Sequence, residues 1–83
     1  MVRQALILGD LKPRSEGANI HKLLEKLRRL NGVKEAQYIT GPYDFYLIVN
    51  VNDQSEMNSV VTELREIEGI KETMTCLVLS PRT

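Results

Sequence analysis

The sequence predicts an α+β domain of element order βαββαβ, in which two helices cover one face of an antiparallel sheet. One observation behind this prediction is an internal repeat: Gly32-Val33-Lys34-Glu35 recurs 37 residues later as Gly69-Ile70-Lys71-Glu72. A second is the set of apolar residues at helical spacing before each copy: Ile20, Leu23, Leu24, Leu27 and Leu30 correspond to Met57, Val60, Val61, Leu64 and Ile67. A solenoid needs about three or more repeats to bury a continuous core, so two copies favour one closed domain over residues 1–83.

The first copy begins with an apolar run within residues 3–9 that predicts a strand, followed by a loop over residues 10–17. The next five apolar residues form one stripe of a helix, because spacings of three and four residues return to the same side. Gly32 lies where the left-handed conformation that commonly ends a helix favours glycine. Residues 36–40 then predict a second strand.

The second copy has the same plan. Residues 44–51 are rich in aromatic and β-branched side chains and predict a third strand. Asp53 with Glu56 three positions later is typical of a helix start, and Gly69 is placed to end that helix. Residues 72–79 predict the last strand, and residues 81–83 are expected to fray. This order is the ferredoxin-like arrangement, a sheet of four antiparallel strands with both helices on one face.

Three of the predicted strands are apolar on both faces, although two helices can cover only one face of a sheet. The runs are Ala5-Leu6-Ile7-Leu8, Phe45-Tyr46-Leu47-Ile48-Val49 and Cys76-Leu77-Val78-Leu79. A chain of this length buries only about 60 to 65% of its unfolded surface, which makes the monomer marginal. Single exposed Val and Leu side chains are ordinary, but three such strands favour sheet-to-sheet packing of two subunits, a dimeric α+β barrel.

The composition argues against several function classes. Eleven basic and eleven acidic residues cancel, which removes the charge that a domain needs to bind nucleic acid phosphates alone. Residues 1–41 carry eight Lys or Arg and four Asp or Glu, whereas residues 42–83 carry three and seven. This asymmetry fits either complementary helix surfaces within one molecule or contacts between the basic and acidic halves of different subunits.

Residues with catalytic or metal-binding chemistry are few. Cys76 is the only cysteine, which excludes an intrachain disulfide and fits a reducing compartment, and we expect it to be a small buried hydrophobe. His21 lies on a charged helix, where solvent exposure is expected. No set of residues has the spacing of a catalytic, metal or cofactor site, so no enzyme activity and no cofactor are expected. The apolar run over residues 5–8 is too short for a signal peptide or membrane span, which predicts a cytoplasmic protein without membrane contact.

The one stretch that the repeat does not explain is the corner between the second and third strands. Strand alternation puts Tyr38 and Thr40 on one face, before Gly41, whose N–H can approach a ligand because no Cβ intervenes. Tyr43 can wall a small pocket, and Asp44 can accept hydrogen bonds from an ammonium group. These features suit a small zwitterion, but Gly-Pro is also common in loops and an aspartate at a turn often bonds its own backbone.

The Gly-x-Tyr-Asp corner, the helix that ends in Gly-Ile-Lys-Glu, and Thr73-Met74-Thr75 entering the last strand together resemble the ligand-binding domain of the Lrp/AsnC family. The resemblance implies a stand-alone regulatory module that binds a small amino acid, dimerises through its sheet and joins dimers into octamer-like rings. It implies ligand contacts near the corner, between dimers, at Tyr38, Thr40, Gly41, Pro42, Tyr43 and Asp44, with Thr73 and Thr75 as weaker candidates.

The helix-turn-helix module of that family has no counterpart here, because residue 5 already lies in the first strand. Direct DNA binding is therefore not expected, and an effect on transcription would pass through a full-length partner regulator. Three other functions stay open. An enzyme of the dimeric α+β barrel type would need a base between sheet and helices, where the candidates are aliphatic. An RNA-binding sheet would need aromatic residues on its first strand, which has none. A purely structural partner subunit is not distinguished from a sensor by the sequence.

Overall fold

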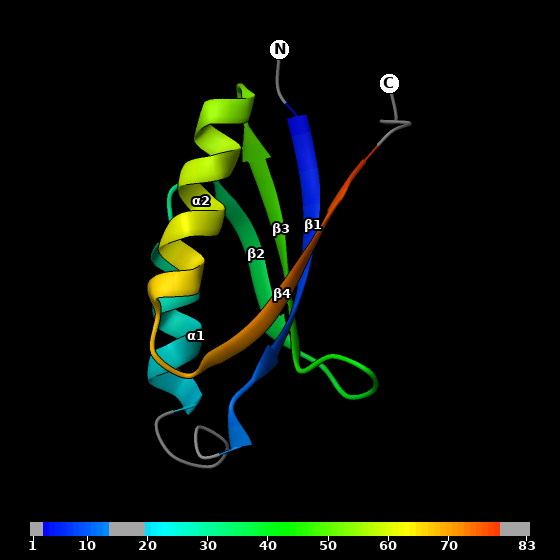
Figure 1. The fold of residues 1–83 in the computed structure, drawn as a ribbon, viewed down its shortest axis with the longest axis vertical. Helices are drawn as coiled ribbons and strands as arrows, with labels where there is room; N and C mark the ends of the chain where they lie inside the picture. Colours follow the sequence, from blue (N-terminus) through cyan, green and yellow to red (C-terminus); the bar gives the residue numbers. More distant parts are fainter. Residues whose placement is uncertain (1–2, 14–19, 79–83) are drawn as a thin grey trace.

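The computed structural model describes residues 3–13 and 20–78. Residues 14–17 of the predicted loop, Leu79 of the predicted last strand and the expected fraying of residues 81–83 lie outside the described residues. The elements in chain order are β1 (Arg3–Leu11), α1 (Ile20–Arg29), β2 (Val33–Tyr38), β3 (Phe45–Val51), α2 (Gln54–Glu66) and β4 (Ile70–Leu77). This is the predicted βαββαβ order (Figure 1).

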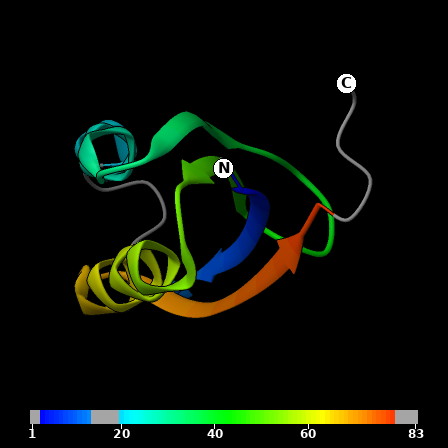
Figure 2. The same cartoon turned by 90° about the horizontal axis from the view of Figure 1, so that it is seen from above.

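The four strands form one antiparallel sheet in the order β2-β3-β1-β4, so the N-terminal strand is central. Ile7 of β1 lies opposite Leu47 of β3 on one side and opposite Thr75 of β4 on the other. Both helices cover the same face of the sheet, and the second face carries no helix (Figure 2). The ferredoxin-like prediction is confirmed.

The core lies between the helices and the inner face of the sheet. Phe45, Leu47 and Val49 alternate along β3 with 0% exposure, and Leu27 of α1 and Leu64 of α2 are equally buried above them. Burying apolar surface contributes about 25 cal/mol per Å², so this two-layer contact is the main stabilising element. Among the described residues, every buried side chain is apolar. Among the described residues, no fully buried side chain of this interior could therefore act as an acid, a base or a ligand for a metal.

The predicted helix ends are confirmed in detail. The Asp53 side chain accepts a hydrogen bond from the Glu56 N–H at 2.9 Å, and Glu56 Oε1 accepts one from the Asn52 N–H at 2.6 Å. This reciprocal pair satisfies two backbone donors at the start of α2. Gly32 and Gly69 have φ angles of 92° and 102°, the left-handed conformation that favours glycine.

The strand bounds differ from the prediction. β2 covers Val33–Tyr38 instead of residues 36–40, and β4 begins at Ile70 instead of residue 72. Each strand starts directly after its left-handed glycine; the Gly32 carbonyl accepts a hydrogen bond from the Asn50 N–H at 2.8 Å. β1 continues to Leu11 across a register shift at Asp10/Leu11, two residues past its predicted end.

The outer face of the sheet is apolar and uncovered in the single chain. It presents Leu6 and Leu8 of β1, Tyr46 and Ile48 of β3, and Met74 and Cys76 of β4, which we call the outer apolar face. Met74 is 49% exposed and Cys76 is exposed, so the prediction of a buried Cys76 is wrong for the single chain. Cys76 is exposed because it lies on the edge strand and on the face of the sheet without helices. The apolar residues next to it in the sequence do not indicate either of these positions.

Candidate ligand-binding corner between β2 and β3

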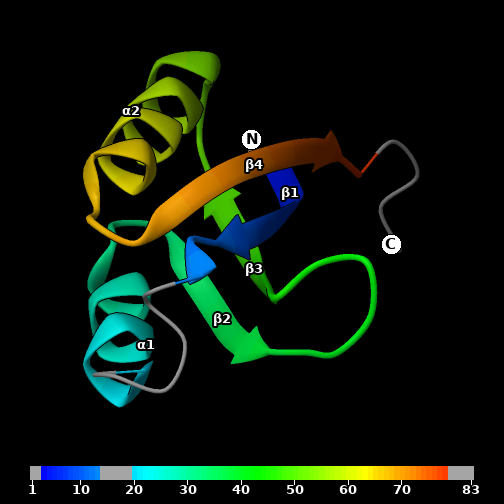
Figure 3. The same ribbon diagram turned by 60° about the horizontal axis from the view of Figure 1, so that its bottom comes forward.

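The corner between β2 and β3 is a loop that projects beyond the sheet (Figure 3). Its base is closed by the Ile39 N–H, which donates to the Asp44 carbonyl oxygen at 2.9 Å. Gly41 is exposed and has a φ of 127°, and a Cβ added there would meet no atom within 4 Å. The positive φ favours glycine at this position, and the space around the Gly41 backbone is open.

Asp44 fastens the corner to the central strand. Its N–H donates to the Gly9 carbonyl oxygen at 2.8 Å, and its Oδ2 accepts a hydrogen bond from the Leu11 N–H at 2.7 Å. The Leu11 N–H lies at the register shift of β1, where regular pairing is interrupted. The carboxylate therefore has a structural role: it accepts a hydrogen bond from the bulge in β1, a different strand, instead of from the backbone of its own turn. Leu11 is the only described residue that donates a hydrogen bond to this carboxylate.

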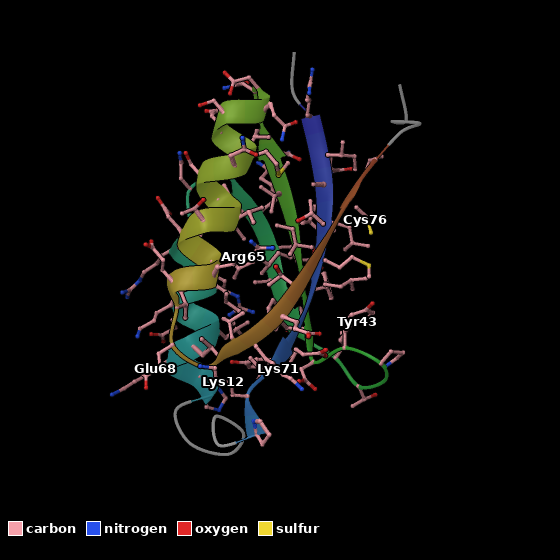
Figure 4. The ribbon with its side chains drawn as sticks, in the orientation of Figure 1. Lys12, Tyr43, Arg65, Glu68, Lys71 and Cys76 are labelled. Carbon is pink, nitrogen blue, oxygen red and sulfur yellow. The ribbon has the colours of Figure 1, made fainter. Side chains whose placement is uncertain are left out.

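Tyr43 reaches from the corner to β4. Its hydroxyl donates to Met74 Sδ at 3.6 Å, and Figure 4 shows Tyr43 and Cys76 on the side of β4 away from α2. This contact joins the corner to the outer apolar face. Met74 was not among the predicted site residues; the signal that could have found it is strand alternation, which sets it on the face opposite Thr73 and Thr75.

The two threonines lie elsewhere. Thr73 pairs with Gly9 and Thr75 pairs with Ile7, so both share the side of the sheet that carries the helices. Thr73 borders a hollow of about 380 Å³ between α2 and β4, together with Arg65 and Lys71, which Figure 4 labels. Thr75 is exposed. Neither threonine shares this side with Tyr43 and its Met74 contact.

The remaining predicted residues form a second small surface. Tyr38, Ile39 and Thr40 line an open hollow of about 540 Å³. Burial raises the pKa of the Tyr38 hydroxyl above its usual value, although backbone and Arg28 contacts act in the opposite direction. The hydroxyl is thus a neutral hydrogen-bonding group at physiological pH. Pro42 is exposed between these residues and Tyr43. The corner brings six of the eight predicted residues together, but they do not enclose one cavity within the chain.

Other chemistry in the described part of the chain is sparse. Residues 3–13 and 20–78 contain no group of three or more His, Cys, Asp or Glu that could hold a metal ion, and His21 is exposed as predicted. On the outer apolar face, the hydrogen bond that Tyr46 donates to Glu35 raises the pKa of the tyrosine. Neither helix is long and apolar enough to cross a bilayer.

Sequence comparison finds a similar segment in larger enzymes. The chain is 39% identical over 54 residues to a homocitrate synthase of Saccharolobus islandicus, a match that covers 65% of this chain and 12% of that protein. A homocitrate synthase of Sulfolobus acidocaldarius is 36% identical over 50 residues, with 60% and 11% covered. The chain thus corresponds to a small part of these enzymes, and their activity does not follow from the match.

Structure comparison finds regulators and proteins of similar size. A protein of Thermus thermophilus is 29% identical with a TM-score of 0.83, covering 98% of both chains. Escherichia coli AsnC is 28% identical with a TM-score of 0.81, and the match covers 99% of this chain but 53% of AsnC. A transcriptional regulator of Neisseria meningitidis in complex with L-Met has a TM-score of 0.78 at 19% identity, with 94% and 50% covered, which shows the fold alone.

The family assignment depends on a comparison of the sequence with a protein-family model that spans the whole domain. The model described as Lrp/AsnC ligand binding domain matches residues 6–82, from the first strand past the end of β4. The match includes the corner, both helices and every strand of the sheet. The chain therefore belongs to the Lrp/AsnC ligand-binding domain family.

Proposed function

We propose that this chain is an amino-acid-binding regulatory module that dimerises through its outer apolar face and binds its effector at the corner between β2 and β3. The observation that carries the proposal is the corner itself, an exposed loop with an open glycine backbone, held in place by Asp44. Because the predicted residues do not enclose a cavity within one chain, a neighbouring subunit completes the site. Assembly and ligand binding are therefore coupled in this proposal.

A regulatory role is favoured over an enzyme. In the described residues the space between sheet and helices is filled by apolar side chains, and no buried polar or charged group is present to transfer a proton. The family and the structural relatives are regulatory. An enzyme of the dimeric α+β barrel type would therefore have to place its chemistry on the outer apolar face. The Leu, Ile, Met and Cys side chains there cannot transfer a proton to carbon or oxygen substrates, so such an enzyme would have to use the Tyr46–Glu35 pair on the exposed sheet surface.

The partner that receives the signal is a second part of the proposal. A domain of this family is part of E. coli AsnC, and a similar segment occurs in homocitrate synthases. Such a module can thus accompany either a DNA-binding unit or an enzyme. We propose that this chain acts through a full-length regulator of the Lrp/AsnC type, in the cytoplasm, and does not contact DNA itself. A purely structural partner subunit would assemble in the same way but would bind no amino acid.

A thermal-shift screen against the twenty amino acids tests ligand binding, with L-Met as the first probe. An amino acid that binds only the folded protein should raise the midpoint, because a ligand at 100 times its Kd adds about 2.7 kcal/mol. The Gly41→Val variant locates the site. A Cβ at Gly41 meets no atom within 4 Å, so if the folded variant no longer shows the ligand-induced rise in midpoint, the valine side chain obstructs the ligand. If no amino acid changes the midpoint of the assembled protein, the structural-partner function replaces the sensor.

Substitution of Asp44 separates its structural role from a ligand role. Asp44→Ala should lower the free energy of unfolding by about 1–3 kcal/mol, because the half-buried Leu11 N–H loses its acceptor. Asp44→Asn keeps a side-chain oxygen for Leu11 and should remain close to the parent protein in stability. If Asp44 pairs with the ligand ammonium, the asparagine variant should still lose about ten- to a hundredfold in affinity by calorimetry. Equal affinity in Asp44→Asn would remove the carboxylate from the ligand site.

A further inference from the structure

The turn between α1 and β2 contains an asparagine directly before a glycine, Asn31-Gly32. In such a pair the glycine nitrogen can attack the side-chain carbonyl carbon of the asparagine, because no Cβ on the attacking residue obstructs the five-membered ring that forms. Asparagine is accordingly one of the thermolabile residues of proteins. The other asparagines in the described part of the chain precede valine, aspartate and serine, whose side chains hinder this attack; they are Asn50, Asn52 and Asn58.

The structure leaves both reacting groups of this pair free. Asn31 is exposed, and its side chain forms no hydrogen bond with the described residues. The Gly32 N–H donates to none of the described carbonyl oxygens, although the next N–H along the chain, that of Val33, donates to the Leu30 carbonyl oxygen at 3.2 Å. The nucleophile and the electrophile therefore lie outside the hydrogen bonds that hold α1 and β2.

The other side of the same turn is closely packed. The Gly32 carbonyl oxygen accepts a hydrogen bond from the Asn50 N–H at 2.8 Å, and a Cβ on Gly32 would lie 2.9 Å from the Asn50 carbonyl oxygen. Asn31 borders a hollow of about 270 Å³ that is also lined by Glu56 and Glu63. A longer main chain at this turn would therefore disturb the start of β2, and a new negative charge would lie near two carboxylates.

We propose that Asn31 is a site of spontaneous deamidation in the folded protein. The Gly32 nitrogen forms a bond to Asn31 Cγ, the Cγ–Nδ2 bond breaks, and ammonia leaves with the proton of the Gly32 nitrogen. Water then opens the resulting succinimide at either of its two carbonyl carbons, which gives aspartate or isoaspartate. Water is the only co-reactant, and the rate increases with pH because the attack requires loss of the proton on the Gly32 nitrogen.

The two products have different effects on the turn. Aspartate adds a negative charge after the C-terminal end of α1, where the helix dipole disfavours a carboxylate. Isoaspartate also adds a methylene group to the main chain before Gly32, and so displaces the Gly32 carbonyl from the Asn50 N–H. Loss of that hydrogen bond should lower the Tm by about 4–8 °C for a domain of this size. This inference goes beyond the proposed function, because it requires neither an effector nor a partner subunit.

Incubation of the folded protein in neutral and in mildly alkaline buffer tests the site. We expect peptide mapping by mass spectrometry to find an amide replaced by a carboxyl group at Asn31, faster at the higher pH. The asparagines at 50, 52 and 58 should stay unchanged, and a carboxyl methyltransferase specific for isoaspartate should label the peptide that contains residue 31. Absence of deamidation until the chain is unfolded in denaturant, or deamidation at another described asparagine instead, would overturn the proposal.

Two variants provide the controls. Asn31→Gln keeps an exposed amide but would have to form a six-membered ring, so it should react far more slowly and keep its Tm during the incubation. Freshly purified Asn31→Asp carries the added charge without the extra methylene group, and its Tm should lie between those of the parent and the isoaspartyl protein. If the isoaspartyl fraction, separated by ion exchange, is as stable as Asn31→Asp, the predicted loss of the hydrogen bond between Asn50 and Gly32 is wrong.

Discussion

Gly9→Ala should unfold the protein or lower its free energy of unfolding by more than about 3 kcal/mol. A Cβ at Gly9 would lie 2.2 Å from Cζ of Phe45, and that ring has 0% exposure in the centre of the core. Neither group can move away, since Gly9 lies in the central strand, paired with Phe45 on one side and Thr73 on the other. For a chain of this size the expected fall in Tm is more than about 12 °C, measurable by circular dichroism.

Two controls isolate the overlap between Gly9 and Phe45. Gly41→Ala introduces the same methyl group where nothing lies within 4 Å, so it should cost only the strain of a positive φ, about 1–3 kcal/mol. In a Phe45→Leu background the ring is gone, and Gly9→Ala should then be tolerated with a much smaller loss. An equal loss in both backgrounds would contradict the contact as the cause.

Aspartate at two neighbouring positions of β3 should have two different effects. Leu47→Asp puts a charge at a position with 0% exposure under the helices and should unfold the chain, because an unpaired buried charge is very costly. Ile48→Asp puts it on the outer apolar face, where Ile48 is half-buried and lies opposite Leu6. The second variant should keep its fold but lose the sheet-face dimer.

Light scattering with circular dichroism distinguishes the two effects. The parent protein should have at least twice the 9.5 kDa mass of one chain, and folded Ile48→Asp should approach that single mass. Ile48→Ala is the matched control, since it shortens the side chain without adding charge and should weaken the dimer only partly. A parent protein that is monomeric at micromolar concentration, or an Ile48→Asp variant that still dimerises, would remove the outer apolar face as an interface.

The fold was predictable because its signals are local and occur twice. The helix stripes, the left-handed glycines and the capping pair of Asp53 and Glu56 act within a few residues of one another, and each is present in the structure. The strand ends were less accurate. β2 and β4 begin directly after Gly32 and Gly69, because a positive φ lets the chain enter the sheet without an intervening turn.

The corner was predictable as a turn, but its contacts were not. Gly41 was found from turn chemistry, whereas the bonds of Asp44 to Gly9 and Leu11 join positions more than thirty residues apart. Such partners follow only from the strand register, and here the register includes a shift at Leu11 that no sequence pattern indicates. For the same reason, Met74 was missed as the partner of Tyr43.

The central position of β1 also constrains how the chain can fold during synthesis. β1 emerges from the ribosome first, but its two neighbours, β3 and β4, are made only after α1 and β2 and after α2, respectively. At about 5–20 residues per second, its last partner is complete on the order of several seconds later. Until then one edge of an apolar strand is unpaired and open to strands of other nascent chains. Addition of β4 is thus the step that closes the sheet, and a chain that stops before Ile70 would expose β1 as an aggregation-prone edge.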